Sequence, residues 1–531
     1  MPPASPTIHG HHDCVIVGGG HNGLAAAAYL ARAGLSTLLL ERLPHVGGAA
    51  VSSAPFPGVP ARLSRYSYLV SVLPDAVAGE LDLGVELRSR STASYSPTAR
   101  AGRRLGLHVE AEEGAATRAS FRALTGGDEE YDAWRGFYAD VAGLATAVAP
   151  TFTEPLPTES ALRERVDAEV WRAIVQRPLG EVVEQRFADD LVRGVVATDG
   201  LIGTFRDLHD PSLAQNRCFL YHLVGNGTGE WRVPVGGMGG VTDALARAAG
   251  SAGAELVTGA RVDGIRTDGD GAEVRWHDGT GERVARARFV LANVAPWVLR
   301  GLLGEQPDEA DRPEGAQLKI NFLLSRLPRL RSGDDPRAAF AGTFHVAEGY
   351  AELQAAYAEA ARGAIPTTPP GELYCHSLTD DSLLGDLAGR GVHTLTYFGL
   401  HMPARLFAGD PAATAAARDE AVHRAIAAID AHLAEPLMDC VLRAPDGSPC
   451  LEAKVPQDVE ADLAMPGGHI FHGDLSWPWA PDDVPLDTPA RQWGVATEDP
   501  RVLLCGSGAR RGGAVSCLGG HNAARAVLAM R

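Results

Sequence analysis

The stretch DCVIVGGGHNGLAAAAYLARAGLSTLLLER constrains the fold more than any other part of the sequence. Residues 14–17 are a short apolar run followed at once by glycines, which predicts a buried strand. Residues 24–33 are rich in alanine and end at Gly34, which predicts a helix with a glycine C-cap. Residues 35–40 form a second apolar run that Glu41 closes. The chain is therefore predicted to begin with a strand, a glycine turn, a helix and a second strand.

The glycine turn fits the pattern G-x-G-x-x-G, and Glu41 lies 18 residues after its last glycine. In dinucleotide-binding folds these glycines allow a tight turn, close approach of the backbone to a pyrophosphate and packing of helix on strand. An acid about 20 residues further on binds a ribose hydroxyl. The first helix turn supplies unpaired N–H groups and a partial positive charge. A glycine turn without a nucleotide is the weaker alternative, given the two strands and the acid. The predicted contacts are Gly18, Gly20, His21, Asn22, Gly23 and Glu41.

A second glycine pair, Gly47 and Gly48, follows directly after the predicted ribose-binding acid. Together with Arg42 and Ala49 it resembles the extended fingerprint of flavoproteins that have two dinucleotide-binding domains. In those proteins the glycine pair lets the chain pass close to the flavin half of the cofactor. The resemblance favours FAD over NAD as the bound dinucleotide.

A middle segment continues the same kind of structure. Its sequence EWRVPVGGMGGVTDALARAAG predicts a helix around residues 242–249 after a run of glycines. Alternating apolar residues then predict short strands at 255–257, 262–267, 273–277 and 289–292. In flavoproteins of this type the strand that contains Val262 passes the adenine and contacts it through its backbone. Packing in the core explains Val262 equally well.

The last segment, RVLLCGSGARRGGAVSCLGGHNAARAVLAMR, predicts a strand at 501–505, a glycine-rich loop and a C-terminal helix that begins at Gly520 or His521. A helix N-terminus there would stabilise negative charge on the N1–O2 edge of a reduced flavin. A separate NADPH motif around Gly506 is rejected, because no further strand with a terminal acid remains. The residues predicted to contact the cofactor here are Gly506, Gly513, Ala514, Val515 and Asn522.

The segments IVGGGHNGLAAAAYLARAG, LERLPHVGGAA, VPVGGMGGVTDALARA, GHIFHGDLSWP and LLCGSGARRGGAVSCLGGHNAARAVL together resemble phytoene desaturase-like FAD oxidoreductases. Within that group they are most similar to the branch named for a pyridine nucleotide-disulfide oxidoreductase domain. The seven cysteines contain no C-x-x-C pair, so the redox dithiol in that name has no counterpart here.

The resemblance implies an α/β fold in which a Rossmann-like FAD domain is assembled from segments 13–90, 230–300 and 469–531. An inserted α+β substrate domain on a mixed sheet is expected from residues 91–229 and 301–468. Residues 1–12 are expected to be a flexible N-terminus. The resemblance also implies dehydrogenation of a hydrophobic or unsaturated substrate, with hydride passing to flavin N5.

Lys319 is the first candidate for chemistry. Residues 317–324 are predicted to form a strand. Because successive side chains of a strand point to opposite faces, Lys319, Asn321 and Leu323 lie on one face. The placement resembles the strand of flavin amine oxidases whose lysine reaches flavin N5 through water. A buried cation there would favour the reduced anionic flavin and assist its reaction with oxygen. An ordinary strand lysine at a domain edge is the alternative.

His521 is the second catalytic candidate, because it lies at the predicted start of the C-terminal helix. A simple capping role explains His521 and Asn522 as well. Tyr68 and Trp477 are predicted to line the flavin ring or the substrate cavity, with core packing as the alternative. No metal site is predicted: His469 and His472 lack a third ligand, and His9, His11 and His12 fall in the predicted flexible terminus.

Composition excludes several other functions. Acidic residues number 66 against 48 basic ones, and the net charge of −18 argues against nucleic-acid binding. No apolar run reaches the length of a membrane-spanning helix, and the first residues lack the pattern of a secretory signal. The charge and the absence of a basic amphipathic helix allow at most weak peripheral membrane contact. A cytoplasmic protein is the expectation.

The leading hypothesis is thus an FAD-dependent dehydrogenase or desaturase that acts on a hydrophobic small molecule, with oxygen or a quinone as electron acceptor. Three alternatives stay open: a flavin amine oxidase, for which Lys319 is the supporting feature, a redox-neutral flavin isomerase, and an interaction protein that keeps FAD structurally. The sequence does not determine the oligomeric state.

Overall fold

The first sheet is mainly parallel and is assembled from N-terminal, middle and C-terminal segments of the chain. The structure is a computed structural model that describes residues 7–531. Within these residues seven strands form this sheet, in the order β10 (Arg261–Thr267), β11 (Ala272–His277), β12 (Glu282–Ala292), β1 (Thr7–Val17), β2 (Thr37–Glu41) and β9 (Glu255–Thr258), with β18 (Val502–Leu504) paired to β12. Strand β1 pairs in parallel with both β2 and β12, as a Rossmann-like sheet requires.

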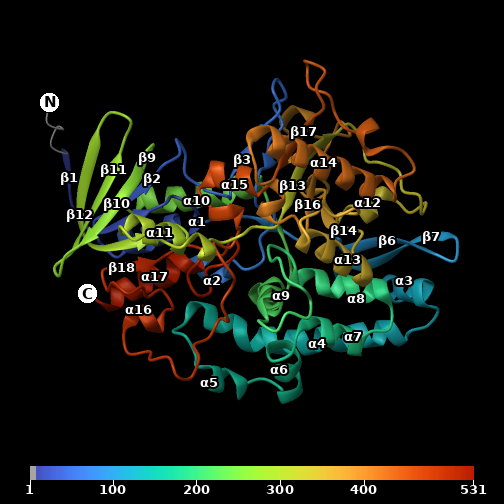
Figure 1. Cartoon of the computed structure of the whole chain (residues 1–531), viewed down its shortest axis with the longest axis horizontal. Coiled ribbons are helices and arrows are strands. Elements are labelled where there is room, and N and C mark those ends of the chain that lie inside the picture. Colours follow the sequence, from blue (N-terminus) through green and yellow to red (C-terminus); the bar gives the residue numbers. More distant parts are fainter. Residues whose placement is uncertain (1–6) are drawn as a thin grey trace.

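Three helices cover one face of this sheet. They are α1 (His21–Arg32), α10 (Gly237–Ser251) and α17 (Leu518–Ala529). Helix α1 packs against both of the others, and their apolar side chains form one core with residues of β1, β2 and β12. Figure 1 shows the blue N-terminal, green middle and red C-terminal segments side by side in this part of the molecule. Smaller helices at its margins are α2 (Asp75–Glu80), α11 (Pro296–Leu302) and α16 (Pro489–Gln492).

The N-terminal strand begins earlier than the sequence predicts. Residues 1–6 of the predicted flexible terminus lie outside the described part, but residues 7–12 belong to β1, so for them the prediction is wrong. The apolar run of 14–17 predicts only the second half of the strand. The first half is polar, and it is ordered by pairing with β12, for example His12 with Ala287.

The second sheet is mixed, as predicted. In the described chain it has seven strands, in the order β17 (Leu451–Lys454), β13 (Leu318–Leu324), β16 (His393–Gly399), β15 (Gly371–Tyr374), β14 (Thr343–Val346), β6 (Thr92–Arg100) and β7 (Arg103–Glu110). Neighbours are antiparallel except β14 and β6. One face packs on an apolar core with α14 (Pro411–Asp430). Two small ladders join β3 (Ser52–Ser53) with β4 (Leu63–Ser64), and β5 (Leu87–Arg88) with β8 (Val233–Pro234).

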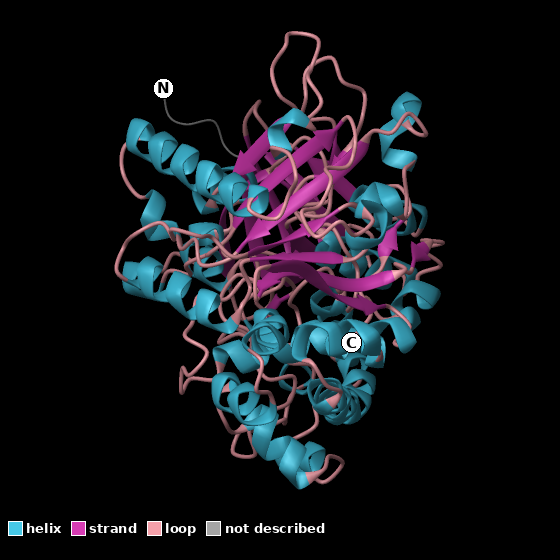
Figure 2. Ribbon diagram, turned by 90° about the vertical axis from the view of Figure 1, so that its right-hand side faces the viewer, coloured by secondary structure: helices cyan, strands magenta, loops and turns pink. Residues whose placement is uncertain are grey.

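A helical layer covers the other side of the second sheet. It lies below the sheets in Figure 1, and Figure 2 shows helices around the strands in the middle of the molecule. The helices share one apolar core: α3 (Ala115–Thr125), α4 (Glu129–Val148), α5 (Glu159–Arg163), α6 (Ala168–Val175), α7 (Leu179–Arg186), α8 (Asp190–Ala197) and α9 (Ala214–Val224). The remaining ones are α12 (Pro336–Ala339), α13 (Tyr350–Ala361) and α15 (Pro456–Leu463). Across residues 7–531, no helix combines the length and the apolar character needed to cross a membrane.

Candidate functional site

The glycine turn between β1 and α1 is packed so closely that side chains are excluded from it. A Cβ added to Gly18 would lie 2.6 Å from the carbonyl oxygen of Asn293, and one added to Gly23 would lie 2.2 Å from the oxygen of Gly18. Asn293 follows β12 and its Nδ2 donates to the oxygen of Gly18 at 2.9 Å. Sequence reasoning missed Asn293, although a polar residue directly after a buried strand is a usable signal.

Glu41 lies where an acid is expected for a ribose. It ends β2 and is buried, and its Oε2 accepts a hydrogen bond from the N–H of Gly19 at 2.7 Å. The second glycine pair passes against this turn: the N–H of Gly47 donates to the oxygen of Gly19 at 2.8 Å, and Gly48 has φ +56. The structure therefore brings Gly18, Glu41 and the second glycine pair together around one turn.

The N-termini of α1 and α17 meet beside this turn. A Cβ on Gly520 would lie 1.9 Å from the carbonyl oxygen of Asn22, so α17 crosses α1 in close contact. Several polar side-chain atoms in this region are buried without a hydrogen-bond partner in the described chain: Nε2 of His21, both amide atoms of Asn22 and Nδ2 of Asn522. Native proteins rarely leave so many buried polar atoms unpaired. A polar ligand between the two helix ends would satisfy them.

The catalytic prediction for His521 is contradicted. Helix α17 begins at Leu518 rather than at residue 520 or 521, and His521 is not among the residues that line the cavity described below. Its Nδ1 donates to Oδ1 of Asn522 at 2.9 Å, and its Nε2 accepts from Nε of Arg525 at 3.2 Å. Burial lowers the pKa of His521 to about 4. Tyr29 packs edge-on against the ring, so His521 is a neutral packing residue.

The C-terminal loop is held by a residue that sequence reasoning missed. Arg511 is 1% exposed and its guanidinium donates to the carbonyl oxygens of Thr151 and Glu154. Arg511 and Ala514 both have positive φ, so the backbone of this loop is tightly turned. Ala514 and Val515 face the cavity described next, together with Ser507. The predicted residue Gly506 lies beside Asn293, its added Cβ being 3.0 Å from the Asn293 Oδ1 atom.

A cavity of about 180 Å³ adjoins the glycine turn, the C-terminal loop and the second sheet. It brings together predicted residues of the first and last FAD-domain segments, His21, Ala49, Tyr68, Ala514 and Val515, with Lys319 of the predicted substrate domain. Most of the other walls are apolar or aromatic: Leu69, Ile202, Trp231, Phe398, Leu463, Met465, Ile470 and Phe471.

Four further residues that the sequence singles out lie outside this cavity. Trp477 does not line this cavity and instead stacks on Trp479, with ring centres 4.9 Å apart, so the prediction that it lines the substrate cavity is wrong. Arg42 donates to the backbone oxygen of Asp462. Val262 pairs with Trp276 in the first sheet. Gly513 packs against Leu475, its added Cβ being 2.4 Å from the leucine Cδ2.

Lys319 lies on β13 with its side chain buried at the cavity wall. Its Nζ donates to the carbonyl oxygens of Ser64 and Tyr66 and lies 4.8 Å from the ring centre of Tyr68. Burial lowers the pKa of Lys319 well below its ordinary value, and the carboxylate of Glu452 opposes that shift. In its protonated form Lys319 has three donors, so in that form one remains for a group in the cavity.

The strand register places Lys319 in a row of polar and aromatic residues across the second sheet. Lys319 is paired with Phe398 of β16, Phe398 with Glu372 of β15, and Glu372 with His345 of β14. Directly paired residues share a face of the sheet. One face therefore runs from the lysine to a buried acidic cluster about three strands away.

This acidic cluster consists of Asp199, Glu348 and Glu372. It lies where the first cavity meets a second one of about 610 Å³, because Asp199, Trp231, Thr343 and Glu372 border both. Glu372 accepts a hydrogen bond from the Tyr374 hydroxyl, and Glu348 is bonded to His345. The Asp199 carboxylate has neither a hydrogen bond nor an ion pair within residues 7–531. None of these three acids was predicted from the sequence.

Burial raises the pKa of Glu348 to about 8 and that of Glu372 to about 7, with the charge of Glu348 adding to the rise at Glu372. A carboxyl group whose pKa is higher in the folded state stabilises the fold below its unfolded pKa of 4.5. This stabilisation is lost as the pH rises towards 8, by about 1.4 kcal/mol per pH unit for one proton.

We therefore expect Glu348→Gln to remove part of this pH dependence. Between pH 5 and 8 the thermal midpoint of the wild type should fall relative to that of the variant. Glu112→Gln, at an exposed acid on the rim of the second cavity, is the control and should behave as wild type. If the thermal midpoints of the wild type and of Glu348→Gln changed with pH in parallel, the inference that the buried Glu348 is neutral would be wrong.

Comparison with known proteins identifies the family. Residues 16–75 match the NAD(P)-binding Rossmann-like domain, and residues 106–323 match the flavin containing amine oxidoreductase family. The chain is 51% identical to the uncharacterized protein Rv0897c of Mycobacterium tuberculosis over 529 residues, which covers 97% of each chain. The chain belongs to this family of flavin-containing oxidoreductases. It is also 28% identical to the mouse pyridine nucleotide-disulfide oxidoreductase domain-containing protein 2, over 99% of this chain and 94% of the mouse protein.

The fold agrees with this family. A variant of putrescine oxidase has a TM-score of 0.59 at 16% identity, with 98% of this chain and 100% of that chain covered. The predicted α/β fold and FAD as cofactor are confirmed. The residues fit FAD: the glycine turn leaves room for a pyrophosphate, Glu41 faces it, and the unpaired polar atoms of His21, Asn22 and Asn522 surround the meeting helix ends.

Proposed function

We propose that this FAD oxidoreductase is a dehydrogenase or desaturase of the phytoene desaturase-like type, which removes hydride from an apolar or unsaturated substrate. The observation that carries the proposal is the cavity beside Lys319, whose walls are mostly apolar and aromatic. Each methylene group buried there contributes about 0.8 kcal/mol of binding free energy. Oxygen or a quinone is the proposed electron acceptor, and a hydrophobic small molecule the proposed partner.

The assignments of residues to FAD follow from the geometry of the turn. We infer that the α1 N-terminus binds the pyrophosphate, that Glu41 binds the ribose, and that Ala49, Ala514 and Val515 border the flavin. Bound FAD supplies the acceptor for the hydride. Lys319, held by two backbone carbonyls, offers its remaining N–H to the same space. We also propose a cytoplasmic location with at most weak peripheral membrane contact, because the charge of −18 opposes anionic lipid.

Forming a carbon–carbon double bond releases a proton together with the hydride. The ionised Asp199 carboxylate can receive it: it borders both cavities and has no partner in the described chain, and desolvation raises its pKa well above the ordinary value, which makes it a stronger base. Glu372, its neighbour at the junction, is already bonded to Tyr374. We therefore infer that Asp199 takes the proton while the apolar walls keep water from the substrate.

An amine oxidase is the second candidate, and the same carboxylate is the observation that favours it. A partly buried carboxylate that has no partner within residues 7–531 suits an ammonium group, and aromatic rings flank the cavity at Tyr68, Tyr374 and Phe398. The family description also names amines. An interaction protein that only stores FAD is not favoured, because such a protein needs no cavity beside Lys319.

Anaerobic mixing of the FAD-loaded protein with two matched panels separates these candidates. One panel contains apolar polyenes and cyclic hydrocarbons, the other primary amines with the same apolar bodies. Loss of the long-wavelength flavin absorbance with the first panel alone supports the dehydrogenase, and loss with the amines alone replaces it by the amine oxidase. Asp199→Asn should keep FAD and slow flavin reduction by at least roughly 100-fold, the lower limit for loss of a general base. Undiminished reduction in Asp199→Asn would exclude Asp199 as the base.

A further inference from the structure

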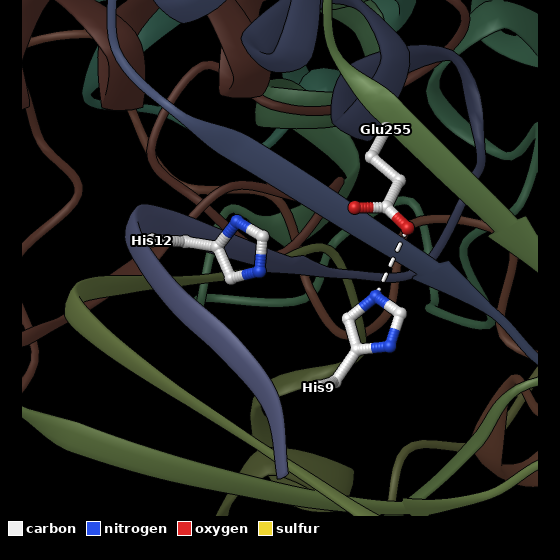
Figure 3. A group of neighbouring side chains, drawn as sticks. All are labelled: His9, His12 and Glu255. Carbon is white, nitrogen blue, oxygen red and sulfur yellow. Dashed lines mark hydrogen bonds and ion pairs between the residues drawn. The ribbon is translucent and has the colours of Figure 1, made fainter.

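A cluster of metal-binding side chains lies on the first sheet, outside the site described above. His9 and His12 come from β1 and Glu255 comes from the start of β9 (Figure 3). One donor atom of each residue lies within 4.8 Å of the others. His9 Nε2 and Glu255 Oε1 are 2.9 Å apart. Figure 3 shows the two imidazoles and the carboxylate gathered on the same side of the β1 strand.

A β-bulge brings the two histidines together. On a regular strand, residues three positions apart point to opposite faces. Here Ile8 pairs with Val284 while Gly10 pairs with Ala285, so His9 is an extra residue that β12 leaves unmatched. Gly10 has φ +138, a conformation that favours glycine. The bulge returns His9 to the face of His12, and such bulges commonly re-aim a side chain at a site.

The neighbouring strand leaves space for this cluster. Strand β2 begins at Thr37, opposite Cys14, so among the described residues the part of β1 before Cys14 has no strand partner on that side. Glu255 begins β9, which pairs with β2 through Leu38. The His9–Glu255 contact therefore connects β1 to β9 past the start of β2.

Both histidines are ordered by their surroundings. The edge of His9 faces Trp276, with ring centres 5.3 Å apart. His12 is partly buried, and its Nε2 has no hydrogen-bond partner in the part of the chain that the structure describes. The Nε2 atom of His12 is therefore available to bind a metal ion.

We propose that His9, His12 and Glu255 bind one divalent transition-metal ion, preferably Zn²⁺, which fastens the N-terminal half of β1 to β9. Two imidazoles and one carboxylate suit zinc, and they do not suit magnesium or calcium, which take oxygen ligands. A water molecule completes a four-coordinate site. The cofactor turn follows the opposite end of β1, so the ion has a structural role that is independent of the oxidoreductase activity.

Calorimetric titration of the FAD-loaded protein with Zn²⁺, after removal of metals by EDTA, tests the site. We expect one saturable equivalent in the wild type. Loss of an indirect partner of a metal site already lowers affinity roughly 10- to 100-fold, so His12→Gln should weaken binding by at least that much. His11→Gln, at an exposed histidine of the same strand that lies outside the cluster, is the matched control and should bind as wild type.

Two further measurements test whether the ion binds at this cluster and not elsewhere on the protein. Co²⁺ bound in place of zinc should give the visible absorption of a four-coordinate nitrogen and oxygen site, and this absorption should be absent in His12→Gln. Zinc should raise the thermal midpoint of the wild type and of His11→Gln but not that of His12→Gln. The seven cysteines are all buried, so thiolates do not compete for the ion. Equal zinc affinity in all three proteins, or no saturable binding in the wild type, would overturn the proposal.

Discussion

Valine in place of Gly23 is expected to weaken FAD binding by roughly 5- to 150-fold, because overpacking costs about 1–3 kcal/mol and sometimes more. A Cβ at this position would lie 2.2 Å from the carbonyl oxygen of Gly18 and 2.9 Å from Nδ2 of Asn293. Gly18 belongs to the turn that faces the pyrophosphate, and Asn293 is hydrogen-bonded to that turn from the end of β12. The helix or the turn must therefore move, and the aligned N–H groups of α1 lose their common direction.

Titration of the apoprotein with FAD, followed by quenching of flavin fluorescence, measures this loss. Gly250→Ala is the matched control, because Gly250 lies in the exposed part of α10 with no atom within 4 Å of an added Cβ. It should bind FAD as the wild type does and gain up to about 1 kcal/mol of helix stability. Unchanged FAD affinity in Gly23→Val would mean that the turn does not hold the cofactor.

The sequence predicts best those elements of the fold that depend on local residue patterns. Residues 14–41 contain an apolar strand, a glycine turn, a helix and a second strand, and each follows from the composition of that segment alone. The family comparison confirms FAD as the cofactor of this unit. The polar first half of β1 escaped prediction because its order comes from pairing with β12, more than 270 residues away in the chain.

The start of α17 shows how packing overrides a local signal. Gly519 and Gly520 predict a loop or a cap, yet both lie inside the helix. They are small because α17 presses against the backbone of α1 and of Cys505, where added Cβ atoms would lie 1.9 Å from Asn22 and 2.5 Å from Cys505. Gly519 and Gly520 are therefore packing residues of the first turn of the helix, and His521 does not line the cavity.

The acidic cluster could not be predicted because its members meet only through tertiary structure. Asp199 follows α8, Glu372 lies on β15 and Glu348 follows β14. The register that pairs Glu372 with both His345 and Phe398 joins three consecutive strands, whereas Asp199 comes from the helical layer, far earlier in the sequence. Within its own segment each acid resembles an ordinary surface residue. Only the sheet and the helical layer together bury these acids at the junction of the two cavities.

Replacement of Lys319 by methionine is expected to slow the reaction of the photoreduced flavin with oxygen by at least roughly tenfold, which corresponds to about 1.4 kcal/mol. The flexible apolar chain of methionine approximates the lysine stem and so preserves packing. What is lost is the N–H that the two carbonyl contacts leave free, at a site that excludes water and so strengthens electrostatic effects. Photoreduction needs no substrate, so stopped-flow absorbance measures this step directly.

Lys454→Met is the matched control, since Lys454 is the only other lysine, pairs with Lys319 across the two strands and borders the same cavity. Its charge is already neutralised by Asp462, whose Oδ2 lies 2.6 Å from the lysine Nζ. The control should therefore react with oxygen at close to the wild-type rate, with FAD content unchanged in both variants. If reoxidation slowed equally in both variants, the total charge of the cavity would be the cause. If Lys319→Met reacted with oxygen at the wild-type rate, Lys319 would have no part in reoxidation.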